Sequence, residues 1–206
     1  MTCAHCIVDI VPNLQNQLGE ISQPKSCKFF LGGTENDLGK NELLISKIHI
    51  FKEFAQHPKT QDGYDFAIAT IEKNSYIGNK IIPKSLNSWW GCFEDLDIEV
   101  NDQICILGFP NNKDLDNIVL CGVESVIAGI TNSFQQDQRK LIMFNGSIDQ
   151  GMSGGPIYLI KNKRYIHMGI VLDGGKVNAQ NMQYGMALTQ DIIAWIEHHL
   201  NNGIVP

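Results

Sequence analysis

Short apolar runs separated by Gly, Asn, Asp and Pro dominate the pattern of hydrophobic and polar positions along this chain. Runs of this length that are rich in Ile, Val, Phe and Leu are typical of β-strands. Many such runs without helical patterns between them favour an all-β barrel or sandwich. The predicted strands are Lys28–Leu31, Leu43–Phe51, Phe66–Glu72, Gln103–Gly108, Ile118–Ile130, Lys140–Phe144, Pro156–Ile160, Tyr165–Leu172 and Tyr184–Leu188.

A single amphipathic helix is predicted after the last of these strands. Between Asp191 and Leu200, the apolar residues Ile192, Trp195 and Ile196 recur at helical spacing and form one stripe. Thr189 stands directly before this stretch and is the expected N-cap. The pattern therefore predicts a β-rich chain that ends on a helix with one apolar face.

Composition narrows the function classes. The chain has 206 residues, 43% of them hydrophobic, which is enough for one domain or for two small barrels that share a cleft. A formal net charge of -6 without a long Lys/Arg run argues against nucleic-acid binding. No apolar run is long enough to span a bilayer, and the first residues do not resemble a signal peptide.

Cysteine spacing leaves several readings open. The even number permits disulfides without proving them. Residues 3–6 read Cys-Ala-His-Cys, which taken alone fits a redox pair or half of a zinc site. A second ligand pair at zinc-finger spacing is missing, and haem attachment needs the His after both cysteines. The six cysteines are Cys3, Cys6, Cys27, Cys92, Cys105 and Cys121.

The segment Gly151–Pro156, which reads GMSGGP, carries the strongest chemical signal. A nucleophilic serine needs an exposed Oγ on a tight turn, and flanking glycines let the backbone bend and a carbonyl approach. The N–H groups of Gly151 and Ser153 could form an oxyanion hole, in which one donor typically lowers the barrier by about 2.7–4 kcal/mol. The same letters also fit a glycine-rich hairpin turn.

A serine needs a base, and the base needs an acceptor that fixes its tautomer. His5 is the candidate base, although a lone His is more often structural. Asp65 is the candidate acceptor, because it opens the apolar strand pattern of Phe66–Ala69, where an unpaired carboxylate would be costly. Taken alone, Asp65 fits a surface turn equally well.

Together these segments resemble the chymotrypsin-like serine proteases, in order and in wording. Thr2–Cys6 is similar to the TAAHC segment of that family, Tyr64–Ile68 to its D-[IFL]-A-[LI] strand and Gly151–Pro156 to its GDSGGP turn. Phe30–Leu38 is similar to its LGEHDL loop, and Ile45–Ile50 to the strand before its HP segment. The resemblance covers nearly the whole chain.

The resemblance implies a serine-type endopeptidase that hydrolyses polypeptides through an acyl-enzyme, without a cofactor or a metal. Ser153 would attack the carbonyl carbon, His5 would move the proton, and Asp65 would orient His5. Gly151 and Ser153 would form the oxyanion hole. Family members are usually secreted, so the same fate is expected here. The alternative is a catalytically impaired homologue that binds or scaffolds; an esterase ranks lower, because its His follows its Ser.

The fold that the resemblance implies is two antiparallel six-stranded barrels followed by a C-terminal helix. We expect one protease domain over residues 1–206, with the remainder of the N-terminal barrel in 1–85, a linker and the second barrel in 86–188, and the helix in 189–202. His5 comes almost at once, whereas two or three strands precede this segment in the family. The first barrel is therefore expected to be incomplete and the chain to fold or work poorly alone.

Three positions depart from the family pattern. Met152 stands where zymogen-activated members carry an Asp that pairs with a new N-terminus, so no such salt bridge is expected. Leu172 replaces the Ser that usually supports the triad Asp, which removes one hydrogen bond. Val171 falls where the glutamyl-specific branch carries a His, so a preference for Glu is not carried over.

The substrate pocket and the disulfides are expected from the resemblance alone. Asp149 and Asp173 could favour a basic side chain or be solvated loop acids. Cys6 matches a family cysteine whose partner lies upstream, and Cys105 could pair with Cys121 across a hairpin. Ser147, Ile148, Gln150, Val171, Asp173 and Gly174 are the candidate substrate-binding residues, within walls formed by 147–150, 171–174 and 184–186.

Overall fold

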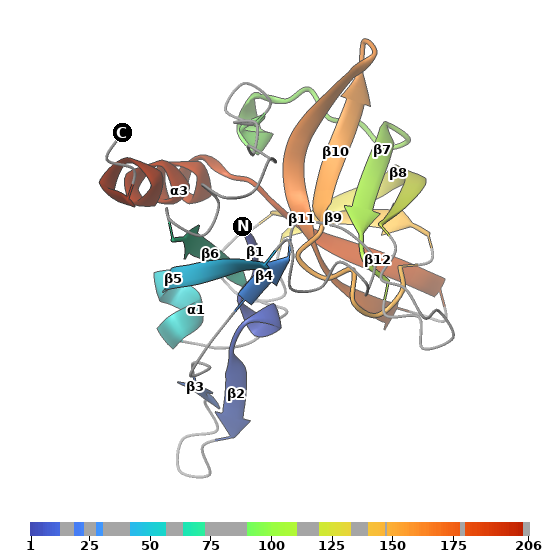
Figure 1. The fold of residues 1–206 in the computed structure, drawn as a ribbon. Coiled ribbons are helices and arrows are strands. Elements are labelled where there is room, and N and C mark those ends of the chain that lie inside the picture. Colours follow the sequence, from blue (N-terminus) through green and yellow to red (C-terminus); the bar gives the residue numbers. More distant parts are fainter. Residues whose placement is uncertain are drawn as a thin grey trace.

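A six-stranded antiparallel barrel forms the C-terminal part of the computed structural model, which describes residues 1–12, 19–22, 28–30, 42–56, 64–72, 90–110, 120–132, 140–146, 148–177 and 180–203. The barrel closes in the order β10-β11-β12-β9-β8-β7 (Figure 1). Its strands are β7 (Gln103–Gly108), β8 (Cys121–Asn132), β9 (Lys140–Asn145), β10 (Pro156–Lys161), β11 (Arg164–Val177) and β12 (Gln180–Ala187).

Alternation along the strands fills this barrel. In β7, Ile104 and Ile106 are fully buried, whereas Gln103 is exposed, as expected where successive side chains point to opposite faces. The barrel core is a cluster of residues from its own strands, Met152 of the turn before β10 and Phe93 of the short 3-10 helix η4 (Phe93–Asp95). Other apolar side chains of β9, β11 and β12 are buried in a second cluster that they share with the N-terminal elements.

The N-terminal part is an open sheet in the described residues. Its four strands follow the order β1-β6-β5-β4, and β2 and β3 form a separate two-stranded ribbon (Figure 1). The elements are β1 (Thr2–Cys3), the 3-10 helix η1 (Ala4–Cys6), β2 (Asp9–Pro12), β3 (Gly19–Ser22), β4 (Lys28–Phe30), β5 (Glu42–Ile50), the short helix α1 (Lys52–Gln56) and β6 (Phe66–Ile71).

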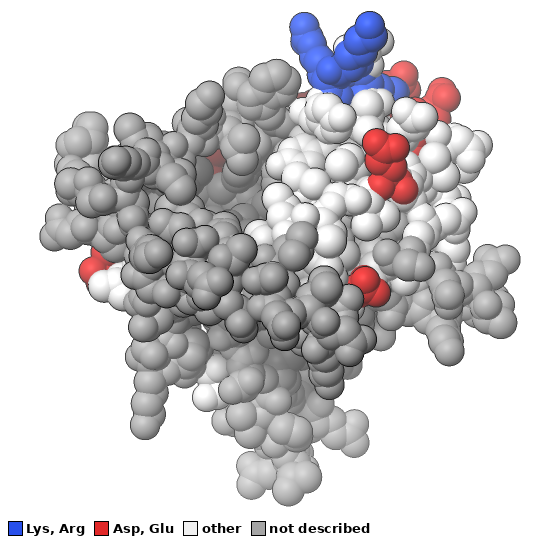
Figure 2. Space-filling model, turned by 45° about the vertical axis from the view of Figure 1, so that its right-hand side comes forward, with Lys and Arg blue, Asp and Glu red and all other residues white. Residues whose placement is uncertain are grey.

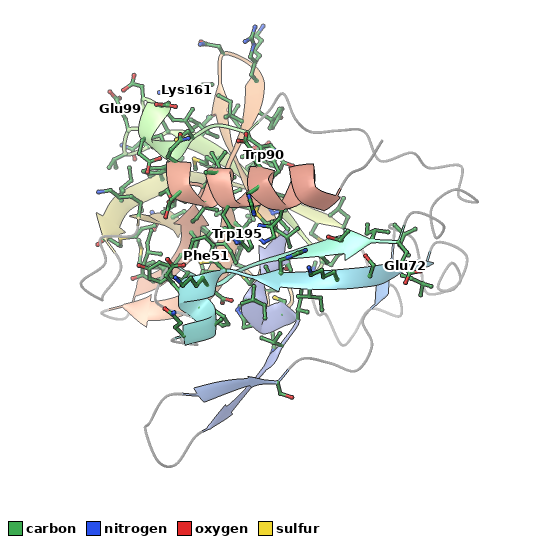
Figure 3. All side chains as sticks on the ribbon, turned by 90° about the vertical axis from the view of Figure 1, so that its left-hand side faces the viewer. Phe51, Glu72, Trp90, Glu99, Lys161 and Trp195 are labelled. Atoms are coloured by element: carbon green, nitrogen blue, oxygen red, sulfur yellow. The ribbon has the colours of Figure 1, made fainter. Side chains whose placement is uncertain are left out.

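Helix α3 (Gln190–Gly203) returns from the barrel and packs on this open sheet. The Trp195 ring meets the Phe51 ring edge to face, with centroids 5.1 Å apart, and Figure 3 shows the two side chains between the helix and the sheet. Ile192 and Ile196 of the predicted stripe are buried in the same cluster. Thr189 directly precedes the helix, and its Oγ donates a hydrogen bond of 2.5 Å to Asp191.

Charged side chains are unevenly spread on the face shown in Figure 2. Lys and Arg gather at the tip of the β10–β11 hairpin, where Lys163 and Arg164 are exposed, whereas Asp and Glu are scattered. The described part of this face carries no long basic stripe. No helix within the described ranges is long and apolar enough to cross a membrane.

The predicted fold class is confirmed: the chain is mostly β, with a closed six-stranded barrel, a second sheet and a C-terminal helix. Cys105 and Cys121 are both free thiols. Their strands pair in a register that sets Cys105 opposite Glu124 and Cys121 opposite Gly108, three positions apart along each strand. Three strand residues span about 10 Å, which is too far for a disulfide, so the hairpin pairing is wrong.

Candidate active site

His5 and Asp65 are brought together by the pairing of β1 with β6. Cys3 stands opposite Phe66 in this ladder, and the next backbone bond runs from the Ala4 N–H to the Asp65 carbonyl at 3.1 Å. The chain then turns through η1, which aims the His5 backbone N–H at Asp65 Oδ1, 2.9 Å away. His5 Nδ1 makes a close hydrogen bond to Asp65 Oδ2. The carboxylate is fully buried and holds His5 by two contacts, one to its backbone N–H and one to its imidazole.

Ser153 lies on a tight turn between the barrel strands β9 and β10. Gly151 and Gly154 adopt positive φ values of 100° and 80°, which side chains with a Cβ rarely tolerate. Met152 is buried in the barrel core and anchors the turn from below. The Gly154 N–H donates to the Val171 carbonyl at 2.8 Å, so β11 holds the other side of the turn.

The two regions touch at this turn. A Cβ on Gly154 would lie 2.1 Å from Thr2 Oγ1 and 2.8 Å from the Cys3 nitrogen, so only glycine lets β1 approach this closely. The Cys6 thiol lies 3.4 Å from the Ser153 carbonyl oxygen. The structure therefore brings the three predicted catalytic residues to one place, two from the sheet and one from the barrel.

His5 Nε2 faces a sulfur in this arrangement. Cys6 Sγ lies 3.6 Å from it, and no hydrogen bond joins it to Ser153 Oγ among the described residues. The bond to Asp65 and then the contact with Cys6 raise the pKa of His5 to about 10. The Cys3 thiol is the largest cause that lowers the pKa of Cys6 to about 5, and His5 adds to it. His5 and Cys6 thus resemble an imidazolium–thiolate pair.

Donors for an oxyanion are available at the turn. Within the described part of the chain, the backbone N–H groups of Gly151 and Ser153 have no hydrogen-bond acceptor. Three other N–H groups of the turn are occupied: Met152 donates to the Asp149 carbonyl at 3.2 Å, Gly154 to the Val171 carbonyl at 2.8 Å and Gly155 to the Met152 carbonyl at 3.0 Å. The turn therefore leaves unoccupied the two donors that the sequence analysis selected.

The pocket candidates fall into three groups. Ile148 and Gln150 lie on the loop before Ser153, one half-buried and one exposed. Val171 is fully buried in the barrel core, and only its backbone reaches the turn. Asp173 and Gly174 continue β11, whose bulge at Leu172 shifts their register against β12. Ser147 lies outside the described residues. The substrate pocket stays a prediction.

The two cysteines beside His5 have contacts that were not predicted from the sequence. Cys3 is fully buried, donates its thiol to the Val171 carbonyl at 3.0 Å, and has its pKa raised by burial. Its sulfur, a His5 ring nitrogen and an Asp65 oxygen lie within 4.8 Å of one another, a donor set that could hold a metal ion. The Cys-Ala-His-Cys spacing was the signal, since it places both sulfurs on one turn.

Solved structures share this fold at low sequence identity. A Glu endopeptidase in complex with MPD aligns with a TM-score of 0.65 and 14% identity over 96% of this chain and 78% of its own. The protease Anisep from Arthrobacter nicotinovorans aligns with a TM-score of 0.60 and 14% identity, over 94% of this chain and 78% of its own. A mutant of human heparin binding protein aligns with a TM-score of 0.60 and 13% identity, over 100% of this chain and 83% of its own.

The family is shown by the sequence itself. No curated protein matches this sequence significantly. The family model for trypsin, however, matches residues 1–196, which include both the open sheet and the closed barrel. This chain therefore belongs to the trypsin family.

Proposed function

We propose that the chain is a serine endopeptidase whose catalytic residues are His5, Asp65 and Ser153. The observation that carries the proposal is the contact between the two regions. The sheet supplies a His held by a buried carboxylate, and the barrel supplies a serine on a glycine turn beside it. A surface turn or a structural His does not require this convergence of three groups from distant parts of the sequence.

In the proposed mechanism, Ser153 Oγ attacks the carbonyl carbon of a polypeptide substrate while His5 Nε2 takes its proton. Asp65 keeps the proton of His5 on Nδ1 and stabilises the imidazolium that forms. The N–H groups of Gly151 and Ser153 donate to the oxyanion of the tetrahedral intermediate. His5 then gives the proton to the leaving amine. In the second half of the reaction, His5 takes a proton from water, the water attacks the acyl-enzyme, and His5 returns the proton to Ser153 as it leaves.

A fluorophosphonate probe tests the proposal, because it labels activated serines covalently. The wild-type chain should be labelled at Ser153, and Ser153→Ala should lose labelling and lower peptide hydrolysis by on the order of a millionfold. Ser125→Ala is the matched control, since Ser125 lies on the barrel strand β8, and it should label normally. Labelling that persists in Ser153→Ala would contradict the assignment.

A catalytically impaired homologue that acts by binding is the second candidate. It is favoured by the contact of His5 Nε2 with Cys6 and by the raised pKa of His5, since a protonated imidazole cannot serve as a base. One structural neighbour is named for heparin binding and not for proteolysis, so the fold alone does not select between the two. Absence of labelling at any pH in a folded chain would favour this candidate.

A further inference from the structure

Cys3 and Cys6 stand at the two ends of one helical turn. Cys3 is the N-cap of η1 and Cys6 is its last residue, and three residues of a 3-10 turn rise by about 6 Å. Disulfides form when the Cα atoms are about 4.4–6.8 Å apart. Both sulfurs are free thiols, and they lie close enough for each to shift the pKa of the other. The spacing of the two cysteines therefore permits a disulfide, although both are free thiols in this structure.

The two sulfurs differ in the way that a redox pair requires. Cys6 is exposed, and its pKa is lowered to about 5, so it is a thiolate at neutral pH. Cys3 is buried, and its pKa is raised by that burial. An exposed thiolate attacks an incoming disulfide, and a nearby thiol then resolves the mixed disulfide. Cys6 fits the first role and Cys3 the second.

The reduced sulfur of Cys6 also contacts His5 Nε2, the ring nitrogen that catalysis needs. It lies against His5 Nε2, the atom that would accept the proton of Ser153, and its contact helps to raise the pKa of His5. A sulfur that is bonded to Cys3 carries neither a proton nor a charge. It would therefore no longer compete with Ser153 for His5 Nε2, and its contribution to the raised pKa of His5, which is second to that of Asp65, would be lost.

We propose that Cys3 and Cys6 form a thiol–disulfide switch, in which a low-molecular-weight disulfide oxidises the pair and thereby releases His5 Nε2 to serve Ser153. The effect on Ser153 rests on the proposed function, whereas the formation of the disulfide does not. The reduced chain is then the latent form and the oxidised chain the active form.

The exchange balances in two steps. The Cys6 thiolate attacks one sulfur of the oxidant, such as glutathione disulfide, and forms a mixed disulfide while one glutathione thiolate leaves. The Cys3 thiol loses its proton to that thiolate, attacks the Cys6 sulfur and expels the second glutathione. The two protein sulfurs together lose two electrons, the oxidant gains them, and a thiol reductant reverses both steps.

The test compares the full-length chain after reduction and after oxidation with glutathione disulfide. Peptide mapping of the oxidised protein should find Cys3 linked to Cys6. At neutral pH, oxidation should raise the rate of fluorophosphonate labelling at Ser153 at least about tenfold, because a correctly placed general base typically contributes about 10²–10⁴-fold in rate. Reduction should reverse the gain.

Variants separate the switch from other effects of oxidation. Cys6→Ala should label quickly in reducing buffer and ignore the oxidant, because it removes the competing sulfur from an exposed position. Cys92→Ser, which changes a free thiol outside this turn, should respond to oxidation as the wild type does. Cys3→Ser should form no internal disulfide, and intact-mass measurement after oxidation should find Cys6 still carrying one glutathione, because the resolving thiol is missing.

The outcomes distinguish the two proposals. A chain that labels at Ser153 equally in both redox states, slows on oxidation, or links Cys6 to a cysteine other than Cys3 overturns the switch while leaving the protease in place. A slow Cys6→Ala variant also overturns it. If neither the oxidised wild type nor Cys6→Ala labels in any buffer, the proposed protease function itself fails.

Discussion

The closed barrel and the open sheet bury their apolar residues in different ways. The barrel core consists of side chains from its own strands and η4. The sheet shares its core with Ile192 and Ile196 of α3 and with residues from β9, β11 and β12. The barrel core therefore takes no side chain from the sheet, whereas the core of the sheet depends on elements that come later in the chain. Because the catalytic candidates divide between the two regions, activity reports on their contact and not on the barrel alone.

Among the changes that separate the two regions, the largest effect is expected from Asp65→Asn, which changes only the sheet side of the site. The amide cannot hold His5 in the required tautomer, so peptide hydrolysis should fall about 10⁴-fold, while Ser153 and its turn stay in place. Steady-state kinetics measure the change, and circular dichroism checks the fold. Asp95→Asn, at an exposed position in η4, is the control and should remain active. Equal activity of both variants would remove Asp65 from the triad.

A matched pair of core truncations should separate the stabilities of the two regions. Ile104→Ala opens a cavity in the barrel core, and Ile196→Ala opens one beneath α3; each side chain is at most 1% exposed, and each change should cost about 2–5 kcal/mol. Native-state hydrogen exchange should show that Ile196→Ala deprotects β6 but not β7, whereas Ile104→Ala deprotects both. If Ile196→Ala lowers the protection of β7 as much as that of β6, the two regions unfold as one unit and do not have separate stabilities.

Acid should weaken the barrel through His167 of β11. Burial lowers the pKa of His167 from 6.5 to about 4, and the imidazole packs against Trp90 and Tyr158. Between these pH values the unfolded chain binds a proton that the folded chain does not, so stability is complete above pH 6.5 and falls by about 3 kcal/mol as the pH drops to 4. Urea unfolding across this window measures the loss. His167→Phe should flatten the profile, and an unchanged profile would exclude His167 as the cause.

The smallest effects should come from two adjacent glycines that face different regions. In Gly154→Ala the new Cβ meets Thr2 and Cys3 of β1, whereas in Gly155→Ala it would lie 2.2 Å from the Leu107 carbonyl of the barrel. Each substitution should cost about 1–3 kcal/mol. Gly154→Ala should slow the labelling of Ser153 without deprotecting β7, and Gly155→Ala should do both. Deprotection of β7 in Gly154→Ala would mean that the turn and the barrel are not separable.

The sequence was informative where apolar runs were long. All nine predicted strands correspond to strands of the structure within a few residues, because β-branched runs bounded by turn residues leave few other choices. The strands β1, β2 and β3 were not predicted. They have two to four residues each, and the β2–β3 ribbon is specified by pairing between its two strands and not by an alternating pattern in either.

The candidate site was predictable as a set of residues but not as a geometry. Motif order selected His5, Asp65 and Ser153, since each needs neighbours that its local sequence displays. The orientation of His5 Nε2 toward Cys6 depends on side-chain rotamers on a single helical turn, which spacing does not encode. The fully buried side chain of Val171 likewise follows from the position of β11 in the closed barrel, which a linear pattern cannot show.

The return of α3 to the open sheet also sets an order of events during synthesis. A ribosome releases β1, β5 and β6 first, but the helix that covers them emerges only after the last barrel strand. Chains fold as they appear, at roughly 5–20 residues per second, so the sheet waits for several seconds without its cover while the barrel completes itself. We expect nascent chains to carry Ser153 on a formed turn before α3 covers the sheet that holds His5. Such a delay would leave the proposed catalytic residues without their covering helix until synthesis of the chain is nearly complete.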